Sequence, residues 1–167
     1  FAAEAGKFVC ASAGHHMEAV LAANGSGTVA RSRRDKRTLL NIDIGGGSTK
    51  LALVRDGHVI ATAAVAVGAR LIARHADGRL TRIDGPAQTV ADELEITLTL
   101  GEPLAPADEQ RIVQVWTGIL AGLVQRRPPE GLAARLMLTD PLPADPPAQA
   151  LTFSGGVSEF IFEREDA

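Results

Sequence analysis

The sequence predicts an α/β fold, with antiparallel hairpin strands in a mixed sheet that is flanked by helices. Three observations lead to this prediction. Two runs of β-type residues, 38–44 and 50–54, are separated by only a few small residues, as in a hairpin. A further apolar run at 150–153 ends at a pair of glycines. Between these runs, residues 106–127 place apolar side chains at helical spacing, so strands come first and helices follow.

The turn between the first two runs is a candidate anion site. It is built from glycines and hydroxyl residues: Gly45, Gly46, Gly47, Ser48 and Thr49. Glycine can reach positive φ without a Cβ clash, so we expect successive backbone N–H groups to point into one concavity, to which the hydroxyl residues add donors. Asp43 stands at the mouth of this cradle. Its carboxylate can accept a hydrogen bond from the water shell of a phosphate-bound metal ion or from an attacking water.

A structural alternative for the same residues is a tight glycine hairpin whose first strand ends in a buried, hydrogen-bonded Asp43. The glycines alone do not decide between the two interpretations. Two other phosphate motifs are excluded by spacing. A P-loop needs Gly-Lys-Ser/Thr leading into a helix, but here Lys50 follows the hydroxyl residues and a strand resumes. The dinucleotide fingerprint needs a glycine where Lys50 stands.

Turn residues divide the chain after the hairpin into short elements. Asp-Gly at 56–57 predicts a second tight turn and therefore three antiparallel strands, at about 39–45, 49–55 and 58–66. We then expect a short helix, a strand and a chain break, at 68–75, 80–83 and 84–86. Residues 90–104 mix helix and strand signals and are left unassigned.

The clearest helix spans Pro106 to Arg127. Proline suits its first turn, acidic residues follow, and two arginines and two prolines mark its end. Its apolar side chains fall on one face and predict a core contact: Ile112, Val115, Trp116, Ile119, Leu120, Leu123 and Val124. A second helix is expected at 130–138, and a proline-rich exposed loop at 141–147 leads to the strand at Leu151.

Before the hairpin, the sequence predicts a strand, a helix and a flexible loop, at 7–12, 15–23 and 25–27. The basic run 31–37 is predicted as a solvated connector. His15 and His16 suggest a metal site only weakly, because adjacent helical side chains point about 100° apart, and a role at the start of the helix or at the surface is the preferred interpretation.

The composition is that of one globular domain and excludes several classes of function. Of 167 residues, 46% are apolar and 22% are charged, and the formal net charge of −3 gives no indication of nucleic acid or an anionic membrane as partner. No apolar run has the length of a membrane span. The single cysteine, Cys10, cannot form an internal disulfide, so we expect the reducing cytoplasm. The chain starts without Met and stops soon after the glycine pair, so we expect residues 1–167 to be one domain excised from a longer protein.

The pattern of strand, Asp43, glycine turn and strand resembles the phosphate-binding hairpin of the superfamily of sugar kinases, heat-shock chaperones and actin. The segment Ser154-Gly155-Gly156 is similar to the adenosine motif of that superfamily. The resemblance implies one lobe of a two-lobed actin-like ATPase (ribonuclease H-like) fold. It also implies that 45–49 hold the phosphates of ATP, that Asp43 acts on the water shell of Mg²⁺ or on the attacking water, and that Ser154-Gly155-Gly156 faces the adenosine.

Four motifs in order narrow the resemblance, at 8–16 with 25–27, at 41–49, at 67–72 and at 152–157. Together they are similar to the reactivating factors of ethanolamine ammonia-lyase, chaperone-like ATPases of ethanolamine utilisation. That family implies release of damaged cobalamin from the lyase, with ATP and Mg²⁺, and its exchange for intact adenosylcobalamin. Related reactivators serve diol and glycerol dehydratases, so the choice of the ethanolamine enzyme rests on this resemblance. Ala69, where a second glycine is expected, and Lys50, where a polar or acidic residue is common, are mild departures.

Two other classes of protein share part of the pattern. An exopolyphosphatase-like phosphohydrolase has the same Asp-Ile-Gly-Gly-Gly-Ser-Thr string, but Lys50 and the segment 14–16 count against it. A non-catalytic, actin-like scaffold module would keep the hairpin for stability alone. The superfamily's other phosphate hairpin lies in an N-terminal half that is not in this sequence, so we expect ATPase activity of the full-length protein and little or none of this part alone.

Overall fold

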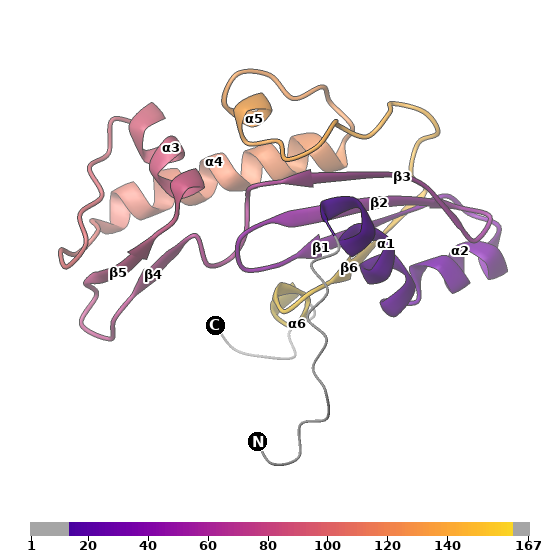
Figure 1. The fold of residues 1–167 in the computed structure, drawn as a ribbon, viewed down its shortest axis with the longest axis horizontal. Helices are drawn as coiled ribbons and strands as arrows, with labels where there is room; N and C mark the ends of the chain where they lie inside the picture. Colours follow the sequence, from indigo (N-terminus) through magenta and orange to yellow (C-terminus); the bar gives the residue numbers. More distant parts are fainter. Residues whose placement is uncertain (1–13, 162–167) are drawn as a thin grey trace, which may run out of the picture.

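The computed structural model describes residues 14–161 and is organised around a mixed four-stranded sheet (Figure 1). Three antiparallel strands are joined by tight turns, and a fourth pairs in parallel with the first, giving the order β3-β2-β1-β6. The strands are β1 Leu39–Ile44, β2 Thr49–Arg55, β3 His58–Val65 and β6 Ala150–Ser154. The predicted α/β class and mixed sheet are confirmed, and the three consecutive strands end within one residue of their predicted bounds. The predicted strand over 7–12, with Cys10, lies outside the described residues.

Helices cover both faces of this sheet (Figure 1). They are α1 His15–Gly25, α2 Thr28–Asp35, α3 Gly85–Glu93, α4 Pro106–Val124, α5 Leu132–Arg135 and α6 Val157–Ile161. On one face, alanines of α1 pack against Ala52 and Val54 of β2. On the other face, Leu40 and Ile42 of β1 belong to a larger core that also contains side chains of α3 and α4. Because side chains alternate along a strand, Asn41 and Asp43 of β1 lie on the face of α1 and α2.

The short helix predicted at 68–75 is wrong. Residues Ile72–Arg74 form β4, which pairs antiparallel with β5, Leu80–Ile83, in a separate two-stranded sheet. The strand predicted at 80–83 is confirmed as β5, and its need for a partner explains why 68–75 does not form the predicted helix. Its backbone N–H and C=O groups need a partner strand, and the residues just before the turn at 77–78 supply it.

The predicted chain break at 84–86 is the beginning of α3. Asp84 is extended, and Pro86 lies in the first helical turn, where its missing N–H removes no helical hydrogen bond. The unassigned stretch 90–104 is therefore helical as far as Glu93. Beyond it, Ile96 and Leu98 are buried in the core but belong to no strand. The alternation of apolar and polar residues around them therefore reflects burial alone and not β structure.

The long helix α4 begins at Pro106, as predicted, and ends at Val124 instead of Arg127. Arg126 has a positive φ of 63°, which is incompatible with continuation of the helix. The predicted apolar face is confirmed as a core contact, since all seven side chains are buried or packed against the larger core. The helix expected at 130–138 is limited to α5. None of the helices between residues 14 and 161 is long and apolar enough to cross a membrane.

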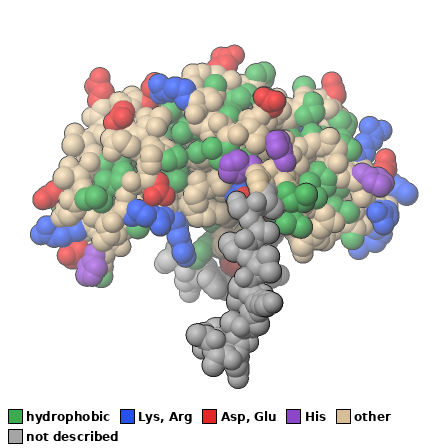
Figure 2. Space-filling view, viewed as in Figure 1, with side chains coloured by type: hydrophobic (Ala, Val, Ile, Leu, Met, Phe, Trp, Pro, Cys, Tyr) green, Lys and Arg blue, Asp and Glu red, His purple; other side chains and the backbone are tan. Residues whose placement is uncertain are grey.

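The helix predicted at 15–23 is confirmed as α1, and 25–27 forms its junction with α2. The basic run 31–37 is not simply a connector, because most of it belongs to α2. The inner side of α2 is polar: Ser32 is fully buried, and its hydroxyl donates to the carbonyl O of Arg37 at 2.7 Å. Apolar periodicity could not reveal such a helix. Its basic side chains are exposed, and Figure 2 shows Lys and Arg gathered at that end of the molecule.

The segment that follows β3 fastens the turn of the first hairpin. The amide N–H groups of Ala69 and Arg70 donate to the carbonyl O atoms of Gly45 and Gly46 at 3.0 and 2.7 Å. Gly68 lies so close to the turn that an added Cβ would be 2.5 Å from the carbonyl O of Gly46. Only a glycine permits this approach, because the obstacle is backbone and cannot move aside.

We expect Gly68→Ala to lower the free energy of unfolding by roughly 2–3 kcal/mol, because the added methyl group separates the hairpin turn from the segment that fastens it. Urea unfolding followed by circular dichroism measures this change. Gly47→Ala is the matched control. A Cβ on Gly47 meets no atom within 4 Å and its φ lies outside the left-handed region, so a change within about 0.5 kcal/mol is expected. Equal unfolding free energies for the two variants would contradict the close approach of Gly68.

Candidate functional site

Asp43 lies where the two motifs of the sequence meet. On β1 it is paired with Lys50 of β2 on one side and with Ser154 of β6 on the other. The hydroxyl of Ser154 donates to Oδ1 of Asp43 at 2.9 Å, although 111 residues separate them. Parallel pairing of β6 with β1 thus brings the glycine pair to the same sheet edge as the glycine turn.

Gly155 makes the closest backbone approach at this edge. Its φ is +83°, and an added Cβ would lie 2.5 Å from the carbonyl O of Ile44 and 3.0 Å from Oδ1 of Asp43. Any side chain would therefore push β6 away from the end of β1 or displace the Asp43 carboxylate. Gly156 is different, because a Cβ there would meet nothing within 4 Å. The two glycines expected to face a nucleoside thus differ: Gly155 is required by packing, and Gly156 borders open space.

The glycine turn presents its amide groups outward, but not through the positive φ angles that the sequence predicted. None of Gly45, Gly46 and Gly47 has positive φ, so the expected left-handed conformation is wrong. Instead, the amide N–H of Gly45 closes the turn on the carbonyl O of Ser48 at 3.0 Å, and the next carbonyl groups are bound by the segment after β3. Gly46 and Gly47 are exposed, and their N–H groups have no acceptor among residues 14–161. The turn therefore leaves two backbone donors exposed at its surface.

The hydroxyl residues of the turn have separate positions. Thr49 is fully buried, and its hydroxyl donates to the carbonyl O of Val67 at 2.7 Å. This bond fastens the hairpin and occupies the only hydroxyl hydrogen of Thr49. Ser48 is half-buried beside the exposed glycines. Of the two hydroxyl groups named from the sequence, only that of Ser48 lies near the open side of the turn.

Lys50 has a counter-charge supplied by α1. Its Nζ lies 3.0 Å from a carboxylate oxygen of Glu18, and its side chain is only 15% exposed. Asp43 and Lys50 share one face of the sheet as a cross-strand pair. The ion pair with Glu18 explains how a lysine is accommodated where an acidic or polar residue was expected.

The two histidines of α1 have different neighbours. Nδ1 of His16 lies 2.7 Å from the hydroxyl of Thr62 on β3, whereas Nδ1 of His15 lies 3.9 Å from the Glu18 carboxylate. No group of three or more His, Cys, Asp or Glu side chains with the geometry of a metal site occurs in the described part of the chain. Asp43 shares its hollow with one other carboxylate, that of Glu159, and two carboxylates suit contact with a metal ion through water more than a full set of direct ligands.

Two neighbouring hollows border Asp43 and the turn. One, of about 730 Å³, has Asp43, Ser154 and Gly155 in its wall. The other, of about 600 Å³, is bordered by the glycine turn, Gly156 and Arg70. Glu159 of α6 lines both hollows, so the start of this helix divides them.

Sequence reasoning missed two side chains of this region. Arg70 is exposed, and a Cβ built on Gly46 would lie 3.7 Å from the Cβ and 3.9 Å from the Cδ of Arg70, so the arginine side chain runs beside the turn. Its place in the motif 67–72 was the available signal. The second is Asn41, a fully buried amide in a strand whose other fully buried side chains are apolar. A polar residue two positions before Asp43, on the same face of β1, was the signal there.

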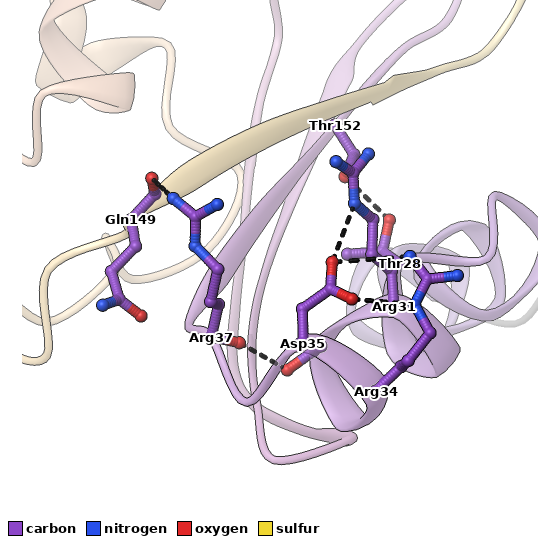
Figure 3. A network of polar contacts seen from close by, with 8 residues as sticks. Thr28, Arg31, Arg34, Asp35, Arg37, Gln149 and Thr152 are labelled. Carbon is purple, nitrogen blue, oxygen red and sulfur yellow. Dashed lines mark hydrogen bonds and ion pairs between the residues drawn. The ribbon is translucent and has the colours of Figure 1, made fainter.

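The start of β6 is joined to α2 and the start of β1 by polar contacts (Figure 3). The hydroxyl groups of Thr28 and Thr152 lie 2.7 Å apart, and the guanidinium of Arg37 donates to the carbonyl O of Gln149 at 2.8 Å. On the outer side of α2, the hydrogen bond from Arg34 lowers the pKa of the Asp35 carboxyl. The contacts of Thr28 with Thr152 and of Arg37 with Gln149 help to fix the register of β6 on β1, and with it the position of Ser154.

Known proteins are similar to this chain over nearly its whole length. The family model described as ethanolamine utilisation protein EutA matches residues 1–167. The ethanolamine ammonia-lyase reactivase EutA of Salmonella typhimurium (strain LT2) is 40% identical over 162 residues, which cover 92% of this chain and 33% of the relative. The reactivase of the same name from Escherichia coli (strain K12) is 36% identical over 162 residues, with the same coverage. The chain thus spans about a third of the length of these curated relatives. It belongs to the EutA family of ethanolamine utilisation proteins.

Proposed function

We propose that this chain is part of an ATP-dependent reactivating factor that acts on ethanolamine ammonia-lyase, releases damaged cobalamin and allows its exchange for intact adenosylcobalamin. The printed names of the two relatives support the lyase as partner and reactivation as the task. The chain would be part of a longer, two-lobed protein of actin-like ATPase fold. The cytoplasm is the proposed compartment, because the scheme consumes ATP.

One observation carries the nucleotide part of this proposal: the hydrogen bond from Ser154 to Asp43 at 2.9 Å. It unites a candidate phosphate hairpin and a candidate nucleoside motif that are far apart in the sequence. Ligand sites combine concave surface with a few convergent polar groups, and hollows of about 730 and 600 Å³ meet at this edge.

The residues present fit a magnesium-bound polyphosphate. The free N–H groups of Gly46 and Gly47 and the guanidinium of Arg70 can donate to phosphate oxygens. Asp43 has one carboxylate oxygen held by Ser154, so the other can accept from metal-bound or attacking water. Bound Mg²⁺ would neutralise the charge of the phosphates. The protein's own contribution is to position donors and one acceptor around them.

The segment Ser154-Gly155-Gly156 is proposed to border the nucleoside. Gly155 lines the hollow that contains Asp43, and Gly156 lines the hollow that contains the glycine turn. The absence of a side chain at Gly156 leaves room next to the phosphate donors, and Gly155 permits the close approach of β6 to Asp43. The buried hydroxyl of Thr49 is not proposed as a phosphate ligand, since it fastens the hairpin to Val67.

The match of the whole chain to the EutA family favours this proposal over an exopolyphosphatase-like phosphohydrolase. A scaffold module without nucleotide binding remains the contrasting hypothesis, and it makes a different prediction. If the hairpin is only structural, Mg-ATP has no reason to stabilise the folded protein.

The full-length protein is expected to gain about 2.7 kcal/mol of stability from Mg-ATP at a hundredfold excess over Kd, measured as a rise in the thermal unfolding midpoint. The absence of a midpoint shift in the wild-type protein would refute nucleotide binding and favour the scaffold hypothesis.

Asp43→Asn is expected to lower kcat for ATP hydrolysis about 100-fold or more, because a neutral amide is a much weaker proton acceptor for the attacking water than a carboxylate.

Arg70→Gln is expected to raise KM for ATP about tenfold, since a charge-assisted hydrogen bond to phosphate is lost. Arg55→Gln is the matched control. Arg55 ends β2, far along the hairpin from the turn, and its charged group lies 3.7 Å from Asp56. Steady-state kinetics of the full-length variants measure both values. Similar KM values for the two variants would remove Arg70 from the phosphate site.

The polypeptide of residues 1–167 by itself is expected to hydrolyse ATP slowly or not at all. Phosphoryl transfer depends on positioning and on charge neutralisation, and the proposed second lobe supplies part of both. Release of inorganic phosphate by the purified polypeptide measures this. A robust rate that disappears in Asp43→Ala would contradict the need for another lobe.

A further inference from the structure

A line of partly buried hydrogen bonds begins at Asn41 and ends on Asp43. Asn41 precedes it by two residues on the same face of β1 and is 1% exposed. The amide Nδ2 of Asn41 donates to Oγ of Ser154 at 3.1 Å, and Ser154 donates to Oδ1 of Asp43 at 2.9 Å. A serine hydroxyl has one hydrogen, and the amide NH₂ group can only donate. The direction of the line, from Asn41 through Ser154 to Asp43, is therefore fixed.

Three hydroxyl groups surround the amide oxygen of Asn41. Ser26, Thr28 and Thr152 each have a hydroxyl 3.1 Å from Oδ1 of Asn41. The hydroxyl of Thr28 also lies 2.8 Å from that of Ser26 and 2.7 Å from that of Thr152. An amide oxygen has two lone pairs, so two hydroxyl groups can donate to it while the third donates to a neighbour. The carboxylate of Asp43 can only accept, so Ser154 donates its hydrogen to it and accepts from the NH₂ group of Asn41; the amide oxygen therefore faces this cluster of hydroxyl groups.

The arrangement exceeds what packing requires. A buried amide in an apolar strand is costly unless every polar atom is satisfied, and an apolar side chain at position 41 would need none of these partners. Here the partners come from two separate parts of the fold: the junction of α1 with the start of α2, and β6. The line ends on a half-buried carboxylate at a hollow, where orientation has a chemical consequence.

We propose that Asn41 is a positioning residue for Asp43, acting through Ser154. This inference rests on the proposed function, in which Asp43 acts on water near the phosphates. The Ser154 hydroxyl holds one carboxylate oxygen, which sets the direction of the other. The amide NH₂ of Asn41 donates to the oxygen of that hydroxyl, so the single hydrogen of Ser154 remains directed toward Asp43. Hydrogen-bonded partners of this kind, one step removed from the reacting atoms, typically contribute 10- to 100-fold to activity.

The decisive variant is Asn41→Asp in the full-length protein. It keeps the shape of the side chain but replaces the donor facing Ser154 by an acceptor. Two carboxylates then compete for one hydroxyl hydrogen, and Asp43 loses its fixed orientation. We expect kcat for ATP hydrolysis to fall about 10- to 100-fold, while KM for ATP changes less than about twofold, because the phosphate donors are untouched.

Ser154→Ala tests the same line without adding a charge. We expect a similar loss of kcat, and we expect Ser154→Thr, which keeps the hydroxyl, to recover most of it. Thr89→Val is the matched control. It removes a hydroxyl of α3 whose hydrogen bond to the carbonyl O of Gly85 lies outside this line, and it should keep kcat within about twofold of the wild-type value.

The outcomes separate this inference from the proposed function. If Asp43→Asn loses kcat but Asn41→Asp and Ser154→Ala keep it, Asp43 works without being positioned, and this inference alone is overturned. If Asp43→Asn also keeps wild-type kcat, the proposed role of Asp43 fails and the inference fails with it. A purely structural role for Asn41 predicts a lower unfolding midpoint with unchanged kcat per folded molecule. Should Asn41→Asp not fold, Ser154→Ala and its threonine counterpart decide the matter.

Discussion

The parallel register of β6 on β1 is the constraint on which the rest of the site depends. It aligns Asp43 with Ser154 and Asn41 with Thr152. Because side chains alternate along a strand, a slip of one residue would place Phe153 beside Asp43 and turn Ser154 to the other face. Apolar contacts oppose such a slip, since Phe153 packs against the larger core together with Ile42. The hydroxyl groups on the opposite face oppose it as well, so two unlike sets of contacts fix one register.

Two glycines outside the turn hold the hairpin between neighbouring segments. Gly68 approaches the turn from the segment after β3, and Gly155 approaches the end of β1 from β6. The first contact has an electrostatic consequence. Since the carbonyl groups of Gly45 and Gly46 accept from that segment, the peptide groups of the turn are oriented with their oxygens inward. Their amide groups are left toward solvent, where an anion can reach them.

Local patterns predicted the parts of the fold that local forces decide. The hairpins and α4 follow from turn residues and apolar periodicity, and the structure confirms them. Two errors occur where contacts outside the apolar pattern decide. Helix α2 is stabilised by polar contacts of the buried Ser32 with Arg37 and Val54, which no periodicity reveals, and β4 exists because β5 needs a partner. Likewise, the sequence predicted the site around Asp43, but the role of Asn41 depends on hydroxyl groups that only the folded chain brings to it.

The charges around the hairpin distinguish its two basic side chains. Lys50 is largely buried and is paired with Glu18, so its charge is compensated within the protein. Arg70 stands exposed at the turn and takes part in no ion pair among the described residues. The open edge therefore combines outward amide groups and this guanidinium with the carboxylates of Asp43 and Glu159. A bare anion would be repelled by these carboxylates, and a bare cation would meet too few ligands. A polyanion that carries its own metal ion satisfies both kinds of group at once.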